Sequence, residues 1–172
     1  MPGRQANFDQ PETGLSDMAL ISSRDGHSFK RWPEAFHRPG RDIKNWVQRN
    51  GYAARGLLQT APDELSIYWT EHYHQTEPSR LRRGTLRVDG FAAVHAGAGG
   101  GDLLTRPLTF KGGKLVLNYA TSAYGSLQVE LQDLDGRAIE GHRLAECPLI
   151  YGDEIEHTVN WEGGTDVERL AG

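Results

Sequence analysis

The chain of 172 residues has a single cysteine, no long apolar run and little excess of charge of either sign. Cys147 alone cannot form an internal disulfide or a multi-cysteine zinc site, and we expect it to be a small, buried apolar residue. No segment approaches the roughly 20 apolar residues that cross a bilayer, and the first residues lack the apolar stretch of a secretory signal. The sequence therefore predicts no membrane partner. The compartment of the whole protein stays open.

The charge balance argues against nucleic-acid binding. The chain has 19 basic and 23 acidic residues, a net charge of -4, and both signs are distributed along its whole length. Such a chain has no strong positive field to attract a polyanion. It also has 21 glycines and 8 prolines, with few stretches of helical periodicity. This composition predicts many tight turns between short strands, and hence an all-β fold.

The first half of the sequence contains a predicted hairpin. In Glu64–Thr70 apolar and polar residues alternate, so Leu65, Ile67 and Trp69 project to one face of a strand. A second extended segment, Thr85–Val88, ends at an Asp-Gly turn. We expect these strands to pair across the loop that joins them.

The second half repeats this pattern of short strands. Residues 97–101 are glycine-rich and typical of a linker, so we place the domain boundary near Val94–Asp102 and expect domains of residues 1–93 and 94–172. A tight turn is expected at Asp133–Gly136, and a helical turn capped by Thr165 near the end of the chain. The predicted extended segments are Leu103–Phe110, Leu115–Ala120, Leu127–Gln132 and Glu156–Trp161.

The segment Ser23–Phe29 has the form of a hairpin turn between an apolar strand and an aromatic one. Asp25 and Gly26 supply the turn chemistry, and Phe29 or Trp32 would anchor the turn in the core. The alternative is that Arg24 or Asp25 contacts a substrate, because turns of this type recur in propeller blades that bind sugars. The sequence leaves both interpretations open.

The segment Trp69–His74 concentrates an acid, two imidazoles and two aromatic rings. Glycoside hydrolysis needs a pair of carboxyl groups, and sugars stack on Trp and Tyr rings, so Glu71 is the best candidate for a catalytic acid. The alternative is a cross-strand ion pair between Glu71 and Arg80, Arg82 or Arg83. His72 and His74 have the spacing of a metal-ligand pair on a strand, but no third ligand follows, so we predict neither a metal nor a cofactor.

The sequence resembles bacterial proteins related to the five-bladed propeller glycosidases of the fructosidase and arabinanase group (families 32 and 43). The resemblance extends from about Leu20 to the end of the chain. The segments that carry it are Ser23–Phe29, Tyr68–Tyr73, Leu81–Arg83, Leu86–Phe91, Gly100–Leu108, Leu117–Ser122, Gly125–Gln132, Gly152–Glu156 and Val159–Gly163.

The resemblance implies one or two last propeller blades followed by a jelly-roll-like β-sandwich. In that group three acidic residues from different blades carry the chemistry, and the motif that contains the nucleophile is absent from this sequence. Arg24-Asp25 is followed by Gly26 rather than by the proline of the Arg-Asp-Pro motif, so the transition-state role is not transferred. Glu146-Cys147 matches the Glu-Cys of the motif that contains the acid in this group. It lies within the predicted sandwich domain, far past the position where that acid belongs, so we treat the match as chance.

These observations predict the C-terminal portion of a glycoside hydrolase that acts on or binds carbohydrate but is not catalytically complete by itself. A stand-alone carbohydrate-binding or structural β-sandwich module is the alternative, and a sialidase-like protein is a third interpretation. An open sheet edge in the second domain predicts self-association. Besides Glu71, the candidate sugar-binding residues are Arg24, Asp25, Trp69, His72, Tyr73 and Arg82.

Overall fold

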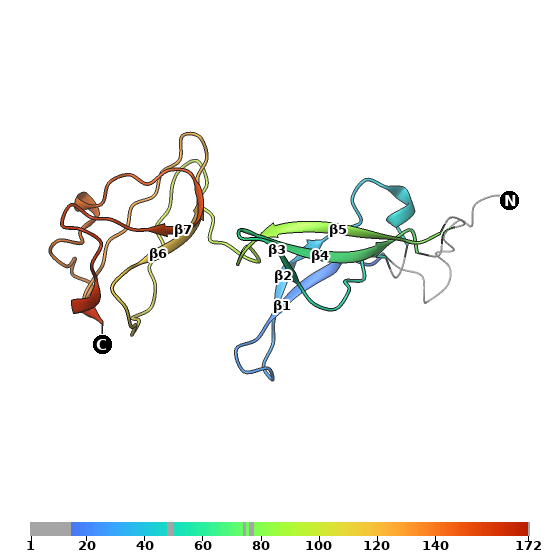
Figure 1. The fold of residues 1–172 in the computed structure, drawn as a ribbon, viewed down its shortest axis with the longest axis horizontal. Coiled ribbons are helices and arrows are strands. Elements are labelled where there is room, and N and C mark those ends of the chain that lie inside the picture. Colours follow the sequence, from blue (N-terminus) through green and yellow to red (C-terminus); the bar gives the residue numbers. More distant parts are fainter. Residues whose placement is uncertain (1–14, 48–49, 74, 76–77, 172) are drawn as a thin grey trace. The chain divides into compact units, whose positions relative to one another are not determined.

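The computed structural model describes residues 15–47, 50–73, 75 and 78–171. The chain divides into two compact units, residues 1–91 and 92–172, a division two residues before the boundary expected from the sequence. The described parts of both units consist of short strands and single turns of 3-10 helix, and every strand pair is antiparallel (Figure 1). The prediction of an all-β protein is confirmed. No helix in the described ranges has the length and apolar character needed to span a membrane.

The first unit contains a two-stranded and a three-stranded sheet. Strands β1 and β2 form the hairpin predicted around Asp25, and β3, β4 and β5 form the second sheet with β4 at its centre (Figure 1). A short 3-10 helix, η1, lies between β2 and β3 in the chain. The bounds of these elements are β1 Met18–Ser22, β2 Lys30–His37, η1 Ile43–Asn45, β3 Leu58–Ala61, β4 Glu64–Glu71 and β5 Arg80–Arg87.

The predicted pairing of β4 with the next strand is confirmed, and it is longer than expected, because all eight residues of β4 have partners on β5. Trp69 is the buried apolar residue of β4, and its indole lies directly over Gly84 of β5. The His37 ring packs on the indole from β2, with ring centroids 4.4 Å apart. Gly84 is therefore the residue that leaves room for Trp69 between the two sheets.

The interior of this unit is unusually polar. Apart from Trp69, the buried side chains among the residues described in this unit are Asn45, Asn50, Ser66, Glu71 and His72. Buried polar groups of this kind need hydrogen-bond partners, and a satisfied network favours one arrangement of the chain over others. On the other face of β4, for example, the fully buried Ser66 accepts a hydrogen bond of 2.8 Å from Arg83 Nε, and Arg83 also pairs with Glu64.

The second unit has a conventional apolar core around Trp161. Its one two-stranded sheet pairs β6 (Val116–Ala120) with β7 (Asp153–Thr158), and the 3-10 helices η2 (Leu144–Glu146) and η3 (Glu168–Leu170) are its other elements. The Trp161 indole is 1% exposed and donates a hydrogen bond of 2.9 Å to the Val129 carbonyl. The core comprises Cys147, Ile150, Val159, Trp161 and Val167, so the expectation of a buried Cys147 is confirmed.

Several predictions for the second half need correction. Residues 127–132 form no strand, although Leu127, Val129 and Leu131 do pack against the core as their alternation predicted. Residues 103–110 also form no strand and are almost entirely exposed. The strand predicted at 156–161 begins and ends earlier, as β7. The turn at Asp133–Gly136 is confirmed, with Gly136 at φ 78°.

The predicted cap at Thr165 is wrong, and one of the two predicted turn anchors is exposed. Val167, not Thr165, precedes the last helical turn, and Asp166 accepts a hydrogen bond of 2.9 Å from the Glu168 amide there. Of the two residues predicted to anchor the β1–β2 turn, Phe29 is 60% exposed and does not do so. Trp32 is half-buried and donates a hydrogen bond of 3.2 Å from its Nε1 to Ser22 Oγ.

Candidate functional site

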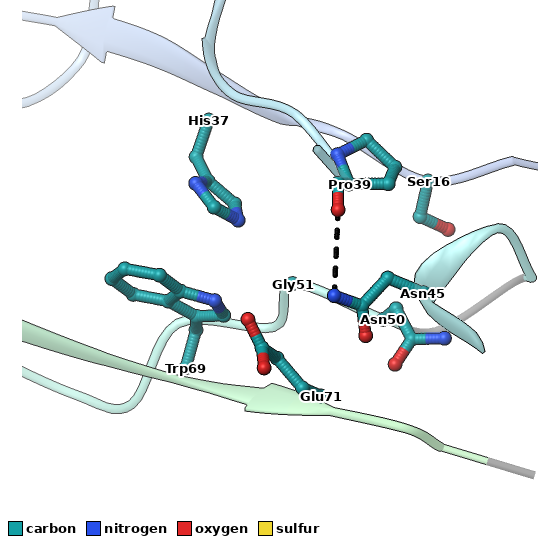
Figure 2. A pocket seen from close by; sticks show the side chains of 8 residues that line it. All are labelled: Ser16, His37, Pro39, Asn45, Asn50, Gly51, Trp69 and Glu71. Carbon is teal, nitrogen blue, oxygen red and sulfur yellow. Dashed lines mark hydrogen bonds between the residues drawn. The ribbon is translucent and has the colours of Figure 1, made fainter. Parts of the chain in front are cut away.

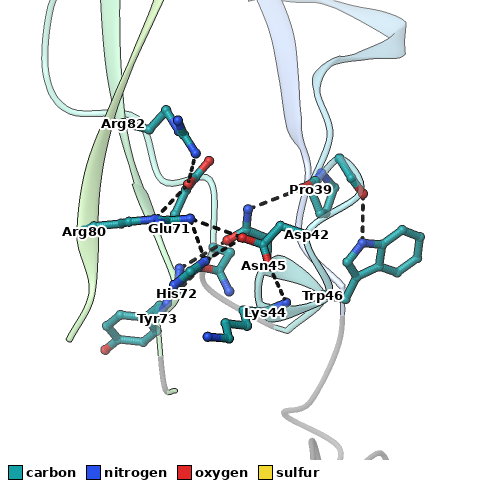
Figure 3. A network of polar contacts seen from close by, with 12 residues as sticks. Pro39, Asp42, Lys44, Asn45, Trp46, Glu71, His72, Tyr73, Arg80 and Arg82 are labelled. Carbon is teal, nitrogen blue, oxygen red and sulfur yellow. Dashed lines mark hydrogen bonds and ion pairs between the residues drawn. The ribbon is translucent and has the colours of Figure 1, made fainter. Parts of the chain in front are cut away.

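The end of β4, the start of β5 and helix η1 bring a network of charged and amide side chains together in the first unit (Figure 3). Its centre is Glu71, whose side chain is 8% exposed. Glu71 Oε2 accepts hydrogen bonds from Arg82 Nη2 at 3.0 Å and from Arg80 Nε at 3.3 Å. The cross-strand ion pair considered for Glu71 is thus present. It involves Arg80 and Arg82, whereas Arg83 projects to the opposite face and pairs with Glu64.

The pKa of Glu71 is lowered by its arginine partners. Burial acts to raise this pKa, but the hydrogen bond and charge of Arg82, the indole N–H of Trp69 and the charge of Arg80 outweigh it. Arg82 in return has a raised pKa, because Glu71 stabilises its charged form. Glu71 is therefore a carboxylate anion at neutral pH.

Asp42 is the second carboxylate of the network, at the N-terminus of η1. One oxygen, Oδ1, accepts from the Lys44 amide at 3.0 Å and so caps the helix. The other, Oδ2, lies 2.8 Å from His72 Nε2 and accepts from Arg80 Nη2 at 3.2 Å. The pKa of Asp42 is lowered, chiefly by the hydrogen bond with His72. Arg80 thus bridges two anionic carboxylates, Asp42 and Glu71.

One ring nitrogen of His72, Nε2, contacts both Asp42 and Arg80. Its Nε2 also lies 3.0 Å from Arg80 Nη2, and the guanidinium is always a donor. The anionic Asp42 carboxylate can only accept, so we assign the Nε2 hydrogen to the 2.8 Å bond with Asp42. His72 Nε2 then does not accept from Arg80, and His72 Nε2 and Arg80 Nη2 both donate to Asp42 Oδ2. The His72 backbone has φ 59°, a left-handed conformation that a residue with a side chain adopts only where contacts hold it.

Two buried asparagines hold the chain where it leaves β4. Asn45 Oδ1 accepts from the His72 amide at 3.2 Å, and Asn50 Oδ1 accepts from the Tyr73 amide at 2.9 Å. Asn45 Nδ2 donates in turn to the Pro39 carbonyl at 3.4 Å. These bonds satisfy backbone donors beyond the last residue of the strand, and they fix His72 and Tyr73 relative to η1.

A small pocket lies beneath Glu71, with a volume of ≈ 10 Å³. Figure 2 shows the Glu71 carboxylate between the Trp69 indole and the asparagine pair. His37 forms part of the wall, and burial lowers its pKa while the charge of Glu71 opposes that shift. The lining residues are Ser16, His37, Pro39, Asn45, Asn50, Gly51, Trp69 and Glu71.

Arg24 and Asp25 lie elsewhere, in the exposed turn of the β1–β2 hairpin. Ser22 and Lys30 pair next to this turn, whereas His37, which reaches Trp69, pairs at the opposite end of the hairpin. Seven residue steps along β2 separate the two ends, roughly 23 Å at 3.3 Å per residue. Asp25 Oδ1 accepts from the amides of His27 and Ser28, which lowers its pKa and holds the turn.

The candidate residues therefore separate into two places. The network and pocket bring together Glu71, Trp69, His72, Tyr73 and Arg82, and leave out Arg24 and Asp25. Residues that sequence reasoning missed complete the site, and of these only Asp42, a typical N-cap residue before η1, had a local signal. The missed residues are His37, Asp42, Asn45 and Asn50.

His74, the second imidazole of the suggested metal pair, is outside the described residues. Within the described part of the chain, no group of three potential metal-binding side chains occurs. Comparison of the chain with protein-family models, with curated proteins and with solved structures finds no match in any of the three.

Proposed function

We propose that the chain is a carbohydrate-binding portion of a propeller-type glycoside hydrolase, and that it binds sugar at the β4–β5 network without hydrolysing it. The assignment of the first unit to propeller blades and of the second to a β-sandwich belongs to this proposal and rests on the sequence resemblance. The all-β character of both units is compatible with it.

The bridging of Glu71 and Asp42 by Arg80 carries the non-catalytic part of the proposal. Glycosidases need one protonated carboxyl group as a general acid, and its pKa is raised by its surroundings. Both carboxyl groups here have lowered pKa values, so both are anionic at neutral pH. A pair held in this state accepts hydrogen bonds but has no proton to donate to a leaving group.

The same network has the groups that bind sugar hydroxyls. The side chains of Arg80 and Arg82 are 50% and 51% exposed, and their pairing with Glu71 fixes the direction of the remaining N–H donors. Nearby, Trp46 is 45% exposed, and a hydrogen bond of 2.9 Å from its Nε1 to the Gly40 carbonyl holds the ring (Figure 3). A fixed, half-exposed indole is a stacking surface for a sugar ring.

The test is to measure sugar binding and hydrolysis on the same sample. We expect saturable binding of at least one mono- or oligosaccharide by calorimetry, and release of reducing ends no faster than in buffer. Arg82→Gln should weaken binding about tenfold or more, because a hydrogen bond to a charged group is lost. Arg83→Gln is the matched control, since Arg83 is the next residue on β5 and projects to the other face. Turnover that Glu71→Gln abolishes would contradict the proposal.

A purely structural module is the second candidate, favoured by the surface of the second unit. Leu103, Leu104 and Leu108 are 67%, 79% and 71% exposed, and in the described part of the chain β6 and β7 pair only with each other. Open edges and exposed leucines recruit strands of other molecules. If this candidate is correct, sedimentation shows concentration-dependent association and no saccharide binds.

A further inference from the structure

Residues 101–110 of the second unit are an exposed segment without regular secondary structure. They contain no turn, bend or strand, and all of them except Phe110 are exposed. Within the described part of the chain, none of them takes part in a backbone hydrogen bond. Phe110 packs against the core and so attaches the segment to its unit. An exposed segment of this kind, with leucines at positions 103, 104 and 108, has the properties of a strand that adds to the edge of another sheet.

Pro107 limits this segment to pairing on one side. In an extended chain, the N–H groups of successive residues point to opposite sides. The N–H groups of Leu104, Arg106 and Leu108 therefore share one side, and Pro107, which has no N–H, belongs to the other. Prolines in sheets are confined to such outer positions. The segment can thus pair through its even-numbered residues, and Pro107 then prevents a further strand from adding to it.

The charges of the segment indicate which sheet edge it fits. Arg106 and Lys111 are the charged residues of positions 103–111, so an acidic strand is the favoured neighbour. Among the strands of the described ranges, only β4 and β7 have more acidic than basic residues. β4 lies between β3 and β5, whereas β7 pairs only with β6 in the described part of the chain. The exposed acidic residues of β7 are Asp153, Glu154 and Glu156.

We propose that two copies of the chain associate through these two elements, with residues 103–108 of each copy adding to the β7 edge of the other. Each β6–β7 sheet then gains a third strand, and Arg106 lies close to the carboxylates of β7. Both elements belong to the second unit, so one two-fold axis forms both contacts at once and leaves neither element open. The inference goes beyond sugar binding and does not depend on it, because the β4–β5 network belongs to the first unit.

Sedimentation of charge-reversed variants tests the pairing. The wild-type chain should form a dimer that dissociates on dilution. Arg106→Glu and Glu156→Arg should each weaken the dimer about tenfold or more, because like charges then face each other. An equal mixture of the two variants should recover the wild-type affinity, because the mixed pair has opposite charges at both contacts. Arg137→Glu is the matched control, since it makes the same change of charge at an exposed position of the same unit and should leave the dimer unchanged.

Hydrogen exchange of single amides distinguishes strand pairing from contact between side chains alone. The amides of Leu104, Arg106 and Leu108 should exchange about tenfold more slowly at protein concentrations that favour the dimer than after dilution. The amides of Thr105 and Thr109 should show no such difference, because they point away from β7. This measurement needs no substitution, so it stands even if a variant does not fold.

Several results would overturn the inference. They are a monomer at every concentration measured, a dimer that both charge reversals leave unchanged, and a mixture of variants that recovers no association. Equal protection of even- and odd-numbered amides would exclude pairing on one side, and a mass that keeps rising with concentration would exclude a closed pair. None of these results bears on sugar binding, which the saccharide titrations test separately.

Discussion

The contact between Gly84 and Trp69 supports a prediction that can be worked out quantitatively. A Cβ added to Gly84 would lie within 2.5 Å of Trp69 Cη2, far inside van der Waals contact. The indole cannot move away freely, because His37 packs on it from the other sheet. Overpacking of this kind costs about 1–3 kcal/mol, so Gly84→Ala should destabilise the first unit by about 2 kcal/mol. Without the clash, alanine in a strand would be favoured over glycine by about 0.5–1 kcal/mol.

A double-mutant cycle separates the clash from other effects of the substitution. Trp69→Ala alone should cost about 3–5 kcal/mol, and in that background Gly84→Ala should be neutral or stabilising. Urea unfolding is the assay, with backbone amide signals of β4 and β7 reporting the two units separately. Gly99→Ala is the control, because a Cβ there meets nothing within 4 Å. A neutral Gly84→Ala in the wild-type background, or an equal cost in both backgrounds, would refute the packing of Trp69 on Gly84.

Three further predictions concern titration and turn structure. The pKa of His37 in the folded protein is below its ordinary 6.5, so below that pH the unfolded chain binds more protons than the folded chain. The first unit should therefore lose stability as pH falls below about 6.5. In urea titrations, His37→Phe should remove this pH dependence. Glu71 has a pKa below its ordinary 4.5, so its contribution is present above that pH and lost as pH falls through the lowered pKa, a loss that Glu71→Gln should abolish. Asp25→Ala should increase the hydrogen-exchange rates of the His27 and Ser28 amides and leave sugar affinity unchanged, and a tenfold loss of affinity would show that the turn contacts ligand.

Strands whose partner lies nearby in sequence could be predicted. The alternation in Glu64–Thr70 is that of β4, and its partner β5 starts nine residues after β4 ends. By contrast, residues 127–132 show equally regular alternation and bury the expected face, yet they form no ladder. Their backbone groups bond to scattered positions, such as Leu127 to Ile150 and Leu131 to His142. Alternation of apolar and polar residues indicates which side chains face a core, but it does not show that a continuous partner strand is present.

The ion pair between Glu71 and arginine could be anticipated from the sequence, but the hydrogen bonds of the two buried asparagines could not. Glu71 and Arg82 occupy nearby positions on a hairpin, so their pairing follows from local register. Asn45 ends the short helix η1 and Asn50 lies five residues later, and they bond to residues 27 and 23 positions away in the chain. No local pattern in the sequence specifies those distant partners. The N-cap position of Asp42 does have a local signal, but its contact with Arg80, at a separation of 38 residues, does not.

The two buried asparagines of the site differ in how their side-chain amides are satisfied. Both are buried, and both use Oδ1 to accept a backbone amide just beyond β4. Asn45 also uses its Nδ2, by donating to Pro39, so its role in the fold accounts for both ends of the amide. Asn50 Nδ2 has no such acceptor in the described part of the chain, and it lies in a pocket beside Trp69 and Glu71. An aspartate at this position would keep the acceptor that the Tyr73 amide needs, but it would bury a second carboxylate in the pocket of the anionic Glu71. The neutral amide is therefore preferred for the fold alone, because it supplies the acceptor without adding a buried charge near Glu71.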